Sequence, residues 1–154
     1  MQPEILRLRE NDMREAAMLR RAALWERLPW LRNVHTPKED EAYWRTHLLN
    51  TATVLGAVSQ GRLAGVIAHG GGWVEQLYVL PAFQNRGIGS ALLGRAKAAA
   101  EAGELRLWTF HANHPARRFY EAHGFAAEKE TDGSGNEERE PDVLYLWRRQ
   151  AGIA

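Results

Sequence analysis

Apolar residues in the middle of the chain follow two periods, which predict a strand, a helix and a second strand. Trp73 to Leu80 is rich in aromatic and branched residues and stops at Pro81, which is typical of a strand. Helical spacing then relates Ile88, Leu92, Ala96 and Ala99. The helix is expected to run to about Ala102, with Gly103 just beyond it, before Leu105 to Phe110 alternates as a strand. This order predicts a parallel βαβ unit with its ligand at the carboxyl ends of the strands.

The N-terminal part is predicted to form an edge strand and two helices. The strand is a short apolar run of Ile5, Leu6 and Leu8. Asn11 or Asp12 is expected to cap the first helix, with Glu15 completing a capping box with Asp12. The apolar face of that helix is expected to hold Ala16, Leu19, Ala23 and Leu24, and Pro29 prevents its continuation.

A second helix is expected to begin with Thr36 as its cap and Pro37 in its first turn. Its apolar side is predicted to consist of Tyr43, Trp44, His47 and Leu48. The loop between the helices, from Trp25 to His35, contains two tryptophans and a histidine.

The remaining pattern predicts a hairpin on either side of the central unit. Thr53 to Ser59 and Leu63 to His69 alternate as strands around a tight turn at Gln60 and Gly61. Toward the C-terminus, a helix capped by Asn113 is expected to end at Gly124. Phe125 starts another strand, a loop covers residues 131–136, and Asp142 to Trp147 closes the second hairpin.

Composition narrows the function classes. A chain of 154 residues is long enough for one domain with its own core, and we expect residues 1–154 to form a single domain. It has no cysteine, no basic and apolar leader at its start and no run of about eighteen apolar residues. We therefore expect a soluble cytoplasmic protein that makes no use of membranes. The net charge of +1 gives no reason to expect nucleic acid as a partner.

The join between the central strand and helix carries the clearest chemistry. Gln84-Asn85-Arg86-Gly87-Ile88-Gly89 places two glycines where the helix begins. Free N–H groups and the helix dipole make such a turn a seat for phosphate, and Arg86 adds positive charge. Two glycines can also merely cap a helix. The turn lacks the Gly-Lys-Ser/Thr of a P-loop and the third glycine of a dinucleotide fingerprint.

Two motifs together resemble the GCN5-related N-acetyltransferase (GNAT) superfamily. The first is Gln84-x-Arg86-Gly87-x-Gly89 after a strand that reads Leu77-Tyr-Val-x-Pro81, and the second is Asn113-x-x-Ala116-x-x-Phe119-Tyr120-x-x-x-Gly124-Phe125. The resemblance implies an α/β (α+β) fold with a mixed, twisted sheet of about seven strands and helices on both faces. It also implies that the motif strand and the strand containing Trp108 diverge, so that the pantetheine arm of coenzyme A (CoA) enters between them.

The resemblance assigns roles to individual residues. It implies that acetyl-CoA is the cosubstrate, with no metal, and that its diphosphate lies on the turn formed by Gln84, Asn85, Arg86, Gly87, Ile88, Gly89 and Ser90. Backbone groups of Leu77 and Val79 should pair with pantetheine, and Asn113 should contact CoA as well as cap its helix. Tyr120 matches the tyrosine that protonates the leaving thiolate. We expect Phe119 to take the core-facing position and Tyr120 to lie a hundred degrees round the helix.

The amine acceptor is protonated near pH 7 because its pKa is about 10.4. It must lose a proton before it attacks, so a general base is useful. Glu75, the sole acidic residue of the motif strand, is the candidate, although a solvated strand carboxylate is the alternative; His69 and His35 are weaker candidates.

The acceptor itself is left open. Seven acidic residues from Glu128 to Asp142 would attract a cationic amine or simply form a solvated loop. Aromatic residues of the first helices would wall a pocket or pack those helices, namely Trp25, Trp30, Tyr43 and Trp44. We expect an N-acetyltransferase acting on a small-molecule amine or amino-acid derivative. A non-catalytic acyl-CoA sensor or partner-binding module and a mononucleotide binder are the alternatives, and a homodimer is compatible with the family.

Overall fold

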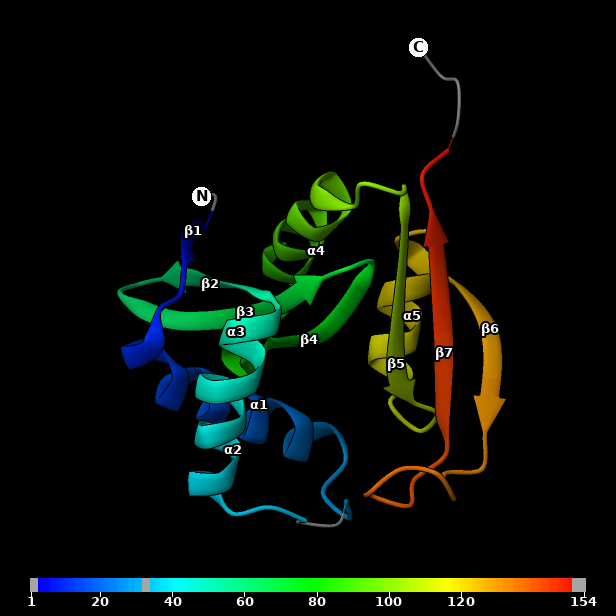
Figure 1. The fold of residues 1–154 in the computed structure, drawn as a ribbon, viewed down its shortest axis with the longest axis horizontal. Coiled ribbons are helices and arrows are strands. Elements are labelled where there is room, and N and C mark those ends of the chain that lie inside the picture. Colours follow the sequence, from blue (N-terminus) through cyan, green and yellow to red (C-terminus); the bar gives the residue numbers. More distant parts are fainter. Residues whose placement is uncertain (1–2, 32–33, 151–154) are drawn as a thin grey trace.

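The computed structural model describes residues 3–31 and 34–150, and its strands form one mixed sheet. The strands are β1 (Glu4–Arg7), β2 (Thr53–Ser59), β3 (Arg62–Gly70), β4 (Trp73–Val79), β5 (Glu104–Phe110), β6 (Ala126–Thr131) and β7 (Asp142–Arg148). Their order in the seven-stranded sheet is β1-β2-β3-β4-β5-β7-β6 (Figure 1). All pairs are antiparallel except β4 with β5. The expected α/β fold with a mixed sheet is confirmed.

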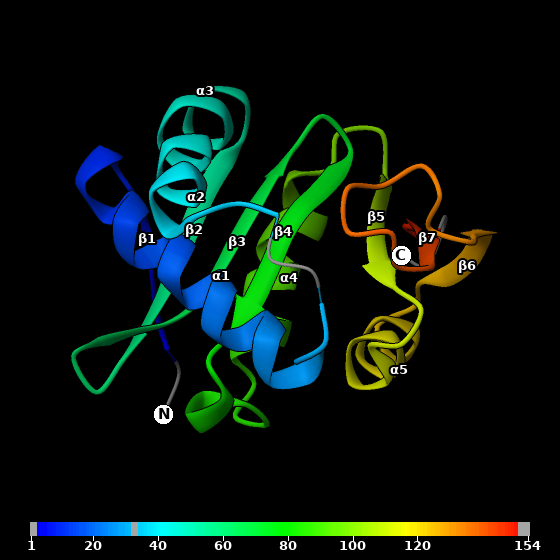
Figure 2. The same cartoon turned by 90° about the horizontal axis from the view of Figure 1, so that it is seen from below.

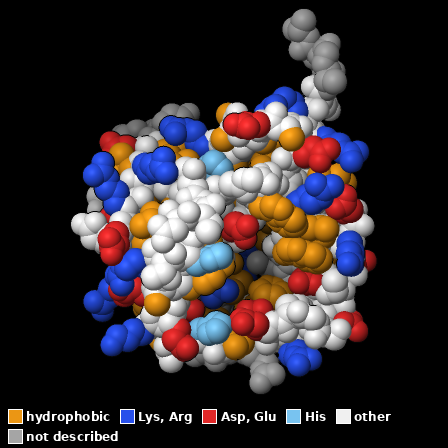
Figure 3. Space-filling model, viewed as in Figure 1, with side chains coloured by type: hydrophobic (Ala, Val, Ile, Leu, Met, Phe, Trp, Pro, Cys, Tyr) orange, Lys and Arg blue, Asp and Glu red, His pale blue; other side chains and the backbone are white. Residues whose placement is uncertain are grey.

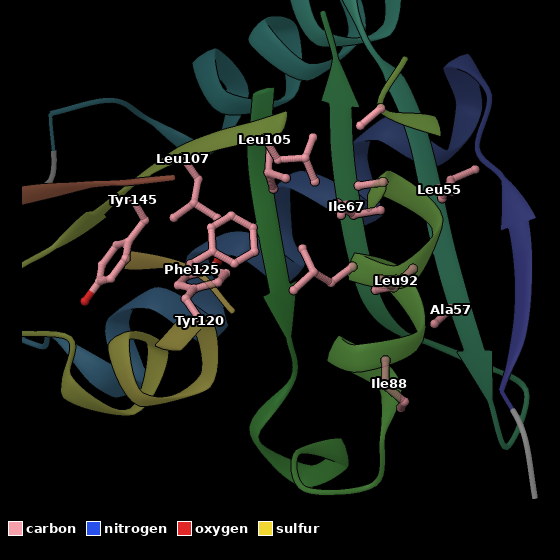
Figure 4. Packing of buried hydrophobic residues seen from close by; sticks show 14 of the residues in the cluster. Leu55, Ala57, Ile67, Ile88, Leu92, Leu105, Leu107, Tyr120, Phe125 and Tyr145 are labelled. Carbon is pink, nitrogen blue, oxygen red and sulfur yellow. The ribbon is translucent and has the colours of Figure 1, made fainter. Parts of the chain in front are cut away.

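Helices cover both faces of this sheet (Figure 2). On one face lie α1 (Met13–Arg27), α2 (Pro37–Tyr43) and α3 (Leu49–Thr51), and the other face carries α4 (Ile88–Ala99) and α5 (His114–Ala122). Every inner position of β3 is buried, because helices pack against both of its sides. The larger core cluster gathers Ile67 from β3, Leu92 from α4 and Leu107 from β5 (Figure 4).

The first two helices begin differently from one another. Thr36 caps α2 as expected, since its hydroxyl accepts from the Glu39 N–H while the Glu39 carboxylate accepts from the Thr36 N–H. The capping box expected between Asp12 and Glu15 is wrong. The Asp12 carboxylate instead accepts a hydrogen bond from the Arg9 N–H at 2.8 Å, across a short 3₁₀ turn, η1 (Glu10–Asp12), that precedes α1.

The helix that begins with α2 continues through a π-helical turn, η2 (Trp44–Leu48), into α3. Trp44 and Leu48 are buried as expected. Tyr43 and His47 are exposed and stack on one another at 4.9 Å between ring centroids, so their predicted place on the apolar side is wrong. The π turn changes the spacing of side chains, and a pattern search with a period of 3.6 residues misses such a change. The predicted start of the loop between α1 and α2, at Trp25, is wrong, because α1 continues to Arg27. Residues 32–33 of that loop lie outside the described residues.

The predicted βαβ unit is present as β4, α4 and β5, but its parallel strands hardly pair. A single register pair joins them, Trp73 with Arg106, and beyond it the two strands diverge. This confirms the divergence that the resemblance implied. The helix α4 ends at Ala99, about three residues before the predicted end, and Gly103 lies in the following turn with a φ of 72°.

One extra residue interrupts β4. Ala68 of β3 opposes Gln76 while the next residue, His69, opposes Val74, so that Glu75 has no partner in β3. This is a β-bulge, which bends the strand and changes the direction of the side chains beyond it. Glu75, the predicted base, is therefore the bulged residue.

The last hairpin places β7, the final strand of the chain, between β5 and β6, so that β6 forms the edge of the sheet. The loop that joins β6 to β7 is closed by its own side chains: the Thr131 hydroxyl bonds to Asp142, and the Asn136 amide donates to the carbonyl of Glu140 at 2.8 Å. Within the described part of the chain, no helix has the length and apolar character to cross a bilayer. The cytoplasmic location stays a prediction.

Candidate active site

A cavity of about 710 Å³ opens where β4 and β5 diverge. Its walls come from α1, β4, the N-terminal turn of α4, β5 and α5. The space-filling view shows a hollow on this face, with acidic side chains at its rim (Figure 3). Of the twelve residues predicted for the site, all but Arg86 line this cavity: Glu75, Leu77, Val79, Gln84, Asn85, Gly87, Ile88, Gly89, Ser90, Asn113 and Tyr120.

The turn before α4 presents backbone N–H groups at one end of the cavity. The first helical bond is donated by the Ala91 N–H to the Gly87 carbonyl at 3.0 Å, which leaves the N–H groups at the start of the helix without helical acceptors. Gly87 has a φ of 82°, a conformation that side chains disfavour. A Cβ on Gly89 would lie 3.2 Å from the Phe119 ring, so this glycine permits α4 and α5 to approach closely.

Arg86 is the predicted site residue that does not line the cavity. Its side chain is exposed, and its guanidinium lies 5.5 Å from the centroid of the Phe83 ring. The charge is still next to the Gly87 turn in the chain. It contributes potential at the mouth of the cavity rather than a contact inside it.

Ser90 has a partner that sequence reasoning missed. Its Oγ lies 2.8 Å from Nε2 of His123, whose Nδ1 is 2.8 Å from the carbonyl oxygen of Phe119. A carbonyl only accepts, so in the neutral ring Nδ1 carries the proton and Nε2 accepts the Ser90 hydroxyl. His123 therefore fixes the orientation of Ser90 at the helix N-terminus. No motif in the sequence signals this pair.

The edge of β4 offers backbone groups to the cavity. The Leu80 N–H donates to the Ala64 carbonyl of β3 at 2.8 Å, and alternate residues of an antiparallel strand point to the same neighbour. Leu77 and Val79 consequently direct their backbone groups toward β5, which has diverged. These are the groups expected to pair with pantetheine.

Gln84 bridges two elements of the site. Its Nε2 donates to the Val79 carbonyl at 2.9 Å, and its Oε1 accepts from the Arg27 guanidinium of α1. The Val79 carbonyl is thus already engaged on one lone pair, while its N–H remains directed at the cavity. Gln84 was predicted as a phosphate-turn residue, and the structure adds that it ties this turn to α1.

Glu75 projects from the bulge of β4 and is exposed to the cavity that it lines. Within the part of the chain that the structure describes, its carboxylate has no ion pair or hydrogen bond. Burial and the nearby negative charge of Glu75 raise the pKa of Tyr43. Tyr43 on α2 and Glu75 on β4 are therefore neighbours across the rim of the site.

Tyr120 lies in a different place from the one expected. Tyr120 is 7% exposed and belongs to the core cluster (Figure 4). Phe119 is only partly buried, so the expected division between the two rings is wrong. The reason is that α5 packs with both rings inward: the Phe119 ring lies against α4, and the Tyr120 ring lies 5.7 Å from that of Phe125. Burial, with a smaller contribution from Tyr78, raises the pKa of Tyr120. Its hydroxyl has no hydrogen-bond partner among the described residues and lies in the cavity wall.

Asn113 holds α5 in place at the far side of the cavity. Its Oδ1 accepts from the Ala116 N–H at 3.4 Å, and the same residue lines the cavity. The predicted capping role is confirmed. A contact with CoA is compatible with it because the side-chain NH₂ remains a donor.

A second cavity of about 690 Å³ lies between α1, α2 and the loop of residues 131–141, next to the first. Four residues line both cavities, namely Arg20, Leu24, Gln76 and Glu138. Trp25, Tyr43 and Trp44 line the second cavity, as the sequence suggested for a pocket, but Trp30 does not. Arg20 and Gln76 were missed, because neither belongs to a recognisable motif.

One cavity thus brings together the N-terminus of α4, the exposed edge of β4 and the carboxylate of Glu75, which has no ion pair among the described residues. Residues 18–125 match the model of the acetyltransferase (GNAT) family. A 56-residue segment is 43% identical to mycothiol acetyltransferase of Clavibacter sepedonicus; it makes up 36% of this chain and 18% of that enzyme.

Solved structures share the fold. A GCN5-related N-acetyltransferase of Rhodopseudomonas palustris superposes with a TM-score of 0.81 at 20% identity, over 96% of this chain and 96% of that one. The PaiA N-acetyltransferase of Thermoplasma acidophilum, solved in complex with coenzyme A, has a TM-score of 0.70 at 23% identity, over 96% of this chain and 99% of that one. The family match spans more than half of the chain, so the protein belongs to the acetyltransferase (GNAT) family.

Proposed function

We propose that this enzyme transfers acetyl from acetyl-CoA directly to the primary amine of a small molecule or amino-acid derivative, and that residues 1–154 act as one domain. The observation that carries the proposal is one cavity that joins the α4 N-terminus, the open edge of β4 and the bulged Glu75. Acetyl-CoA supplies an acetyl thioester. The residues around the cavity bind it, accept a proton from the amine and donate a proton to the departing sulfur.

The turn before α4 holds the diphosphate in this proposal. Its N–H groups and the helix dipole face the anion, and Arg86 strengthens the local positive potential. The residues assigned to it are Gln84, Asn85, Arg86, Gly87, Ile88, Gly89 and Ser90, with Asn113 as a further contact from α5. Backbone groups of Leu77 and Val79 pair with the pantetheine amides and direct the thioester toward the bulge. A backbone N–H of β4 then donates to the carbonyl oxygen as negative charge develops on it.

Proton transfer falls to Glu75 and Tyr120. Glu75 accepts a proton from the acceptor amine, directly or through water, so that the nitrogen lone pair is free to bond to the acetyl carbon. As that bond forms, the bond between the acetyl carbon and sulfur breaks. The Tyr120 hydroxyl donates its hydrogen to the departing sulfur, and the second proton that the nitrogen loses as the amide forms restores this hydroxyl through water. The role is supported by the place of Tyr120 in the cavity wall, where its hydroxyl has no hydrogen-bond partner among the described residues.

Calorimetry with acetyl-CoA and free-thiol release over a broad amine panel test the proposal together. We expect binding and turnover; binding with no turnover on any amine would instead support a non-catalytic sensor. Arg86→Gln should weaken acetyl-CoA binding about threefold, because an exposed charge beside a helix N-terminus contributes about 0.3–1 kcal/mol to the binding of an anion. Arg95→Gln is the matched control, since Arg95 is exposed on α4 away from the turn. Equal effects of the two substitutions would contradict the assigned phosphate turn.

A further inference from the structure

Arg20 of α1 lies where the two cavities meet. It lines both, and its guanidinium carbon is 6.0 Å from the centroid of the Tyr78 ring on β4. Burial alone would lower the pKa of Arg20, but Tyr78, Asp40 and Glu138 raise it above its ordinary value. The side chain is therefore a permanent positive charge in a partly desolvated wall.

The other cavity-lining arginines of α1 already have carboxylate partners. Arg21 pairs with Asp40 at 2.5 Å, and Arg27 pairs with Glu26 at 3.2 Å. Arg20 has no carboxylate within ion-pair distance among residues 3–31 and 34–150. Asp40 and Glu138 stabilise this charge from beyond ion-pair distance, so a carboxylate of a bound molecule would be the first to contact the guanidinium directly.

Gln76, next to the bulge of β4, lacks a hydrogen-bond donor for its side-chain oxygen. Its Oε1 is buried and, within the described residues, it is the one buried side-chain oxygen or nitrogen without a hydrogen-bond partner. Gln76 also lines both cavities. A buried acceptor left unpaired costs about 1–3 kcal/mol, and an N–H donor from a bound molecule would remove that cost.

Most acidic groups around the second cavity are engaged. Asp40 is paired with Arg21, Glu137 lies 2.8 Å from the ring of His35, and Glu39 closes the cap of α2. Where the two cavities meet, Arg20, Glu75 and Glu138 are the charged side chains without an ion pair among the described residues. This arrangement matches a zwitterion better than a polyamine, because a second ammonium group would meet Arg20.

We propose that the acceptor is an amino acid, whose carboxylate binds Arg20 while its amine donates to Gln76 Oε1 and faces Glu75. The apolar part of the second cavity then takes the amino-acid side chain, and its lining favours an apolar or aromatic one: Leu24, Trp25, Leu31, Val34 and Trp44. This assignment rests on the proposed transferase function and specifies its substrate class.

The test compares each amino acid with its decarboxylated amine, for example phenylalanine with phenethylamine and leucine with isoamylamine, by thiol release. We expect kcat/KM to be at least about tenfold higher for the amino acid, the effect of one charge-assisted contact. A carboxylate also lowers the pKa of the neighbouring amine, which by itself would make the amino acid react faster. Only the part of the preference that Arg20→Gln abolishes is therefore evidence for a contact with Arg20. That substitution should raise KM for the amino acid about tenfold or more and change kcat/KM for the amine less than about twofold.

Two further variants make the result specific. Arg20→Lys keeps the charge and should recover part of the amino-acid preference. Arg14→Gln removes an exposed charge from the same helix and should leave kcat/KM unchanged for both the amino acid and the decarboxylated amine. Unchanged acetyl-CoA binding by calorimetry shows that each variant is folded.

Three results would overturn the inference: faster turnover of the decarboxylated amines, faster turnover of a diamine such as putrescine, or equal losses on both substrates in Arg20→Gln. In each of them the wild-type enzyme still acetylates amines, so the proposed function survives. Acetyl-CoA binding without thiol release from any amine would instead overturn the proposed function, and this inference with it.

Discussion

Tyr120→Phe removes one oxygen atom from the wall of the first cavity and leaves the ring in place. The ring contacts with Phe119, Phe125 and Tyr145, at centroid distances of 5.4, 5.7 and 6.2 Å, do not involve the hydroxyl. Because that hydroxyl has no hydrogen-bond partner among the described residues, its loss should change the free energy of unfolding by less than about 1 kcal/mol. For a chain of this length, the melting temperature should then move by less than about 4 °C.

Catalysis should respond much more strongly than stability. Loss of a positioned proton donor lowers the rate by about 10²–10⁴-fold, and we expect kcat to fall into this range while the Kd for acetyl-CoA stays the same. Stopped-flow or steady-state thiol release gives kcat, calorimetry gives Kd, and thermal melting gives the stability.

Tyr145→Phe is the matched control, since Tyr145 is a buried tyrosine of the same cluster whose hydroxyl is engaged. It accepts from Arg117 at 3.1 Å and donates to Glu121 at 2.7 Å. This variant should lose about 1–3 kcal/mol of stability and keep its kcat. The assigned role of Tyr120 would be refuted by an unchanged kcat in Tyr120→Phe, or by equal losses of kcat and of acetyl-CoA affinity.

Three other consequences follow from single residues. Glu75→Gln should lower kcat/KM by about 10²-fold or more near neutral pH with an unchanged Kd for acetyl-CoA, and a rate within about twofold of wild type would exclude Glu75 as the base. Gly133→Ala should destabilise the protein in a urea titration by more than about 1 kcal/mol, because the residue has a φ of 86° and a Cβ there would lie 2.5 Å from the backbone of Glu140. Gly135→Ala, with open space around its Cβ, should cost less than half as much. Burial lowers the pKa of His69, so below the ordinary histidine pKa of about 6.5 the unfolded chain binds more protons than the folded one. The free energy of unfolding should therefore fall as the pH drops below that value. His69→Gln should reduce this dependence of stability on pH.

The parts of the fold that local chemistry determines were predictable. The hairpin of β2 and β3 turns at Gln60 and Gly61, which adopt φ of 54° and 72° as a tight turn with right-handed strand twist requires. The cap of α2 at Thr36 and that of α5 at Asn113 depend on side chains within three residues of the helix start. In all of these cases the residues that determine the structure are close together in the sequence.

The features that long-range packing determines were not predictable in the same way. Helical spacing alone did not show that α5 packs against both α4 and β7, which is why Tyr120 is buried beside Tyr145. Arg20 stands in a helix that reads as ordinary and amphipathic, and only the approach of α1 to β4 places its charge at the junction of two cavities. The place of Arg20 depends on how elements far apart in the sequence pack together, and a local stretch of sequence does not show this.

The bulge at Glu75 changes which side chains of β4 face each of the two cavities. Beyond the bulge, Leu77 and Val79 pack with the cluster that includes α4 and α5, while Tyr78 packs against α1 and its neighbours. Val74, before the bulge, lies in the same cluster as Leu77, although strict alternation would put them on opposite faces. The extra residue thus lets the strand keep apolar side chains on the side proposed for CoA while turning Gln76 toward the second cavity. The bulge also exposes the carboxylate of Glu75 to the first cavity, next to Gln76, which lines both cavities; the proposed amine would reach the proposed thioester there.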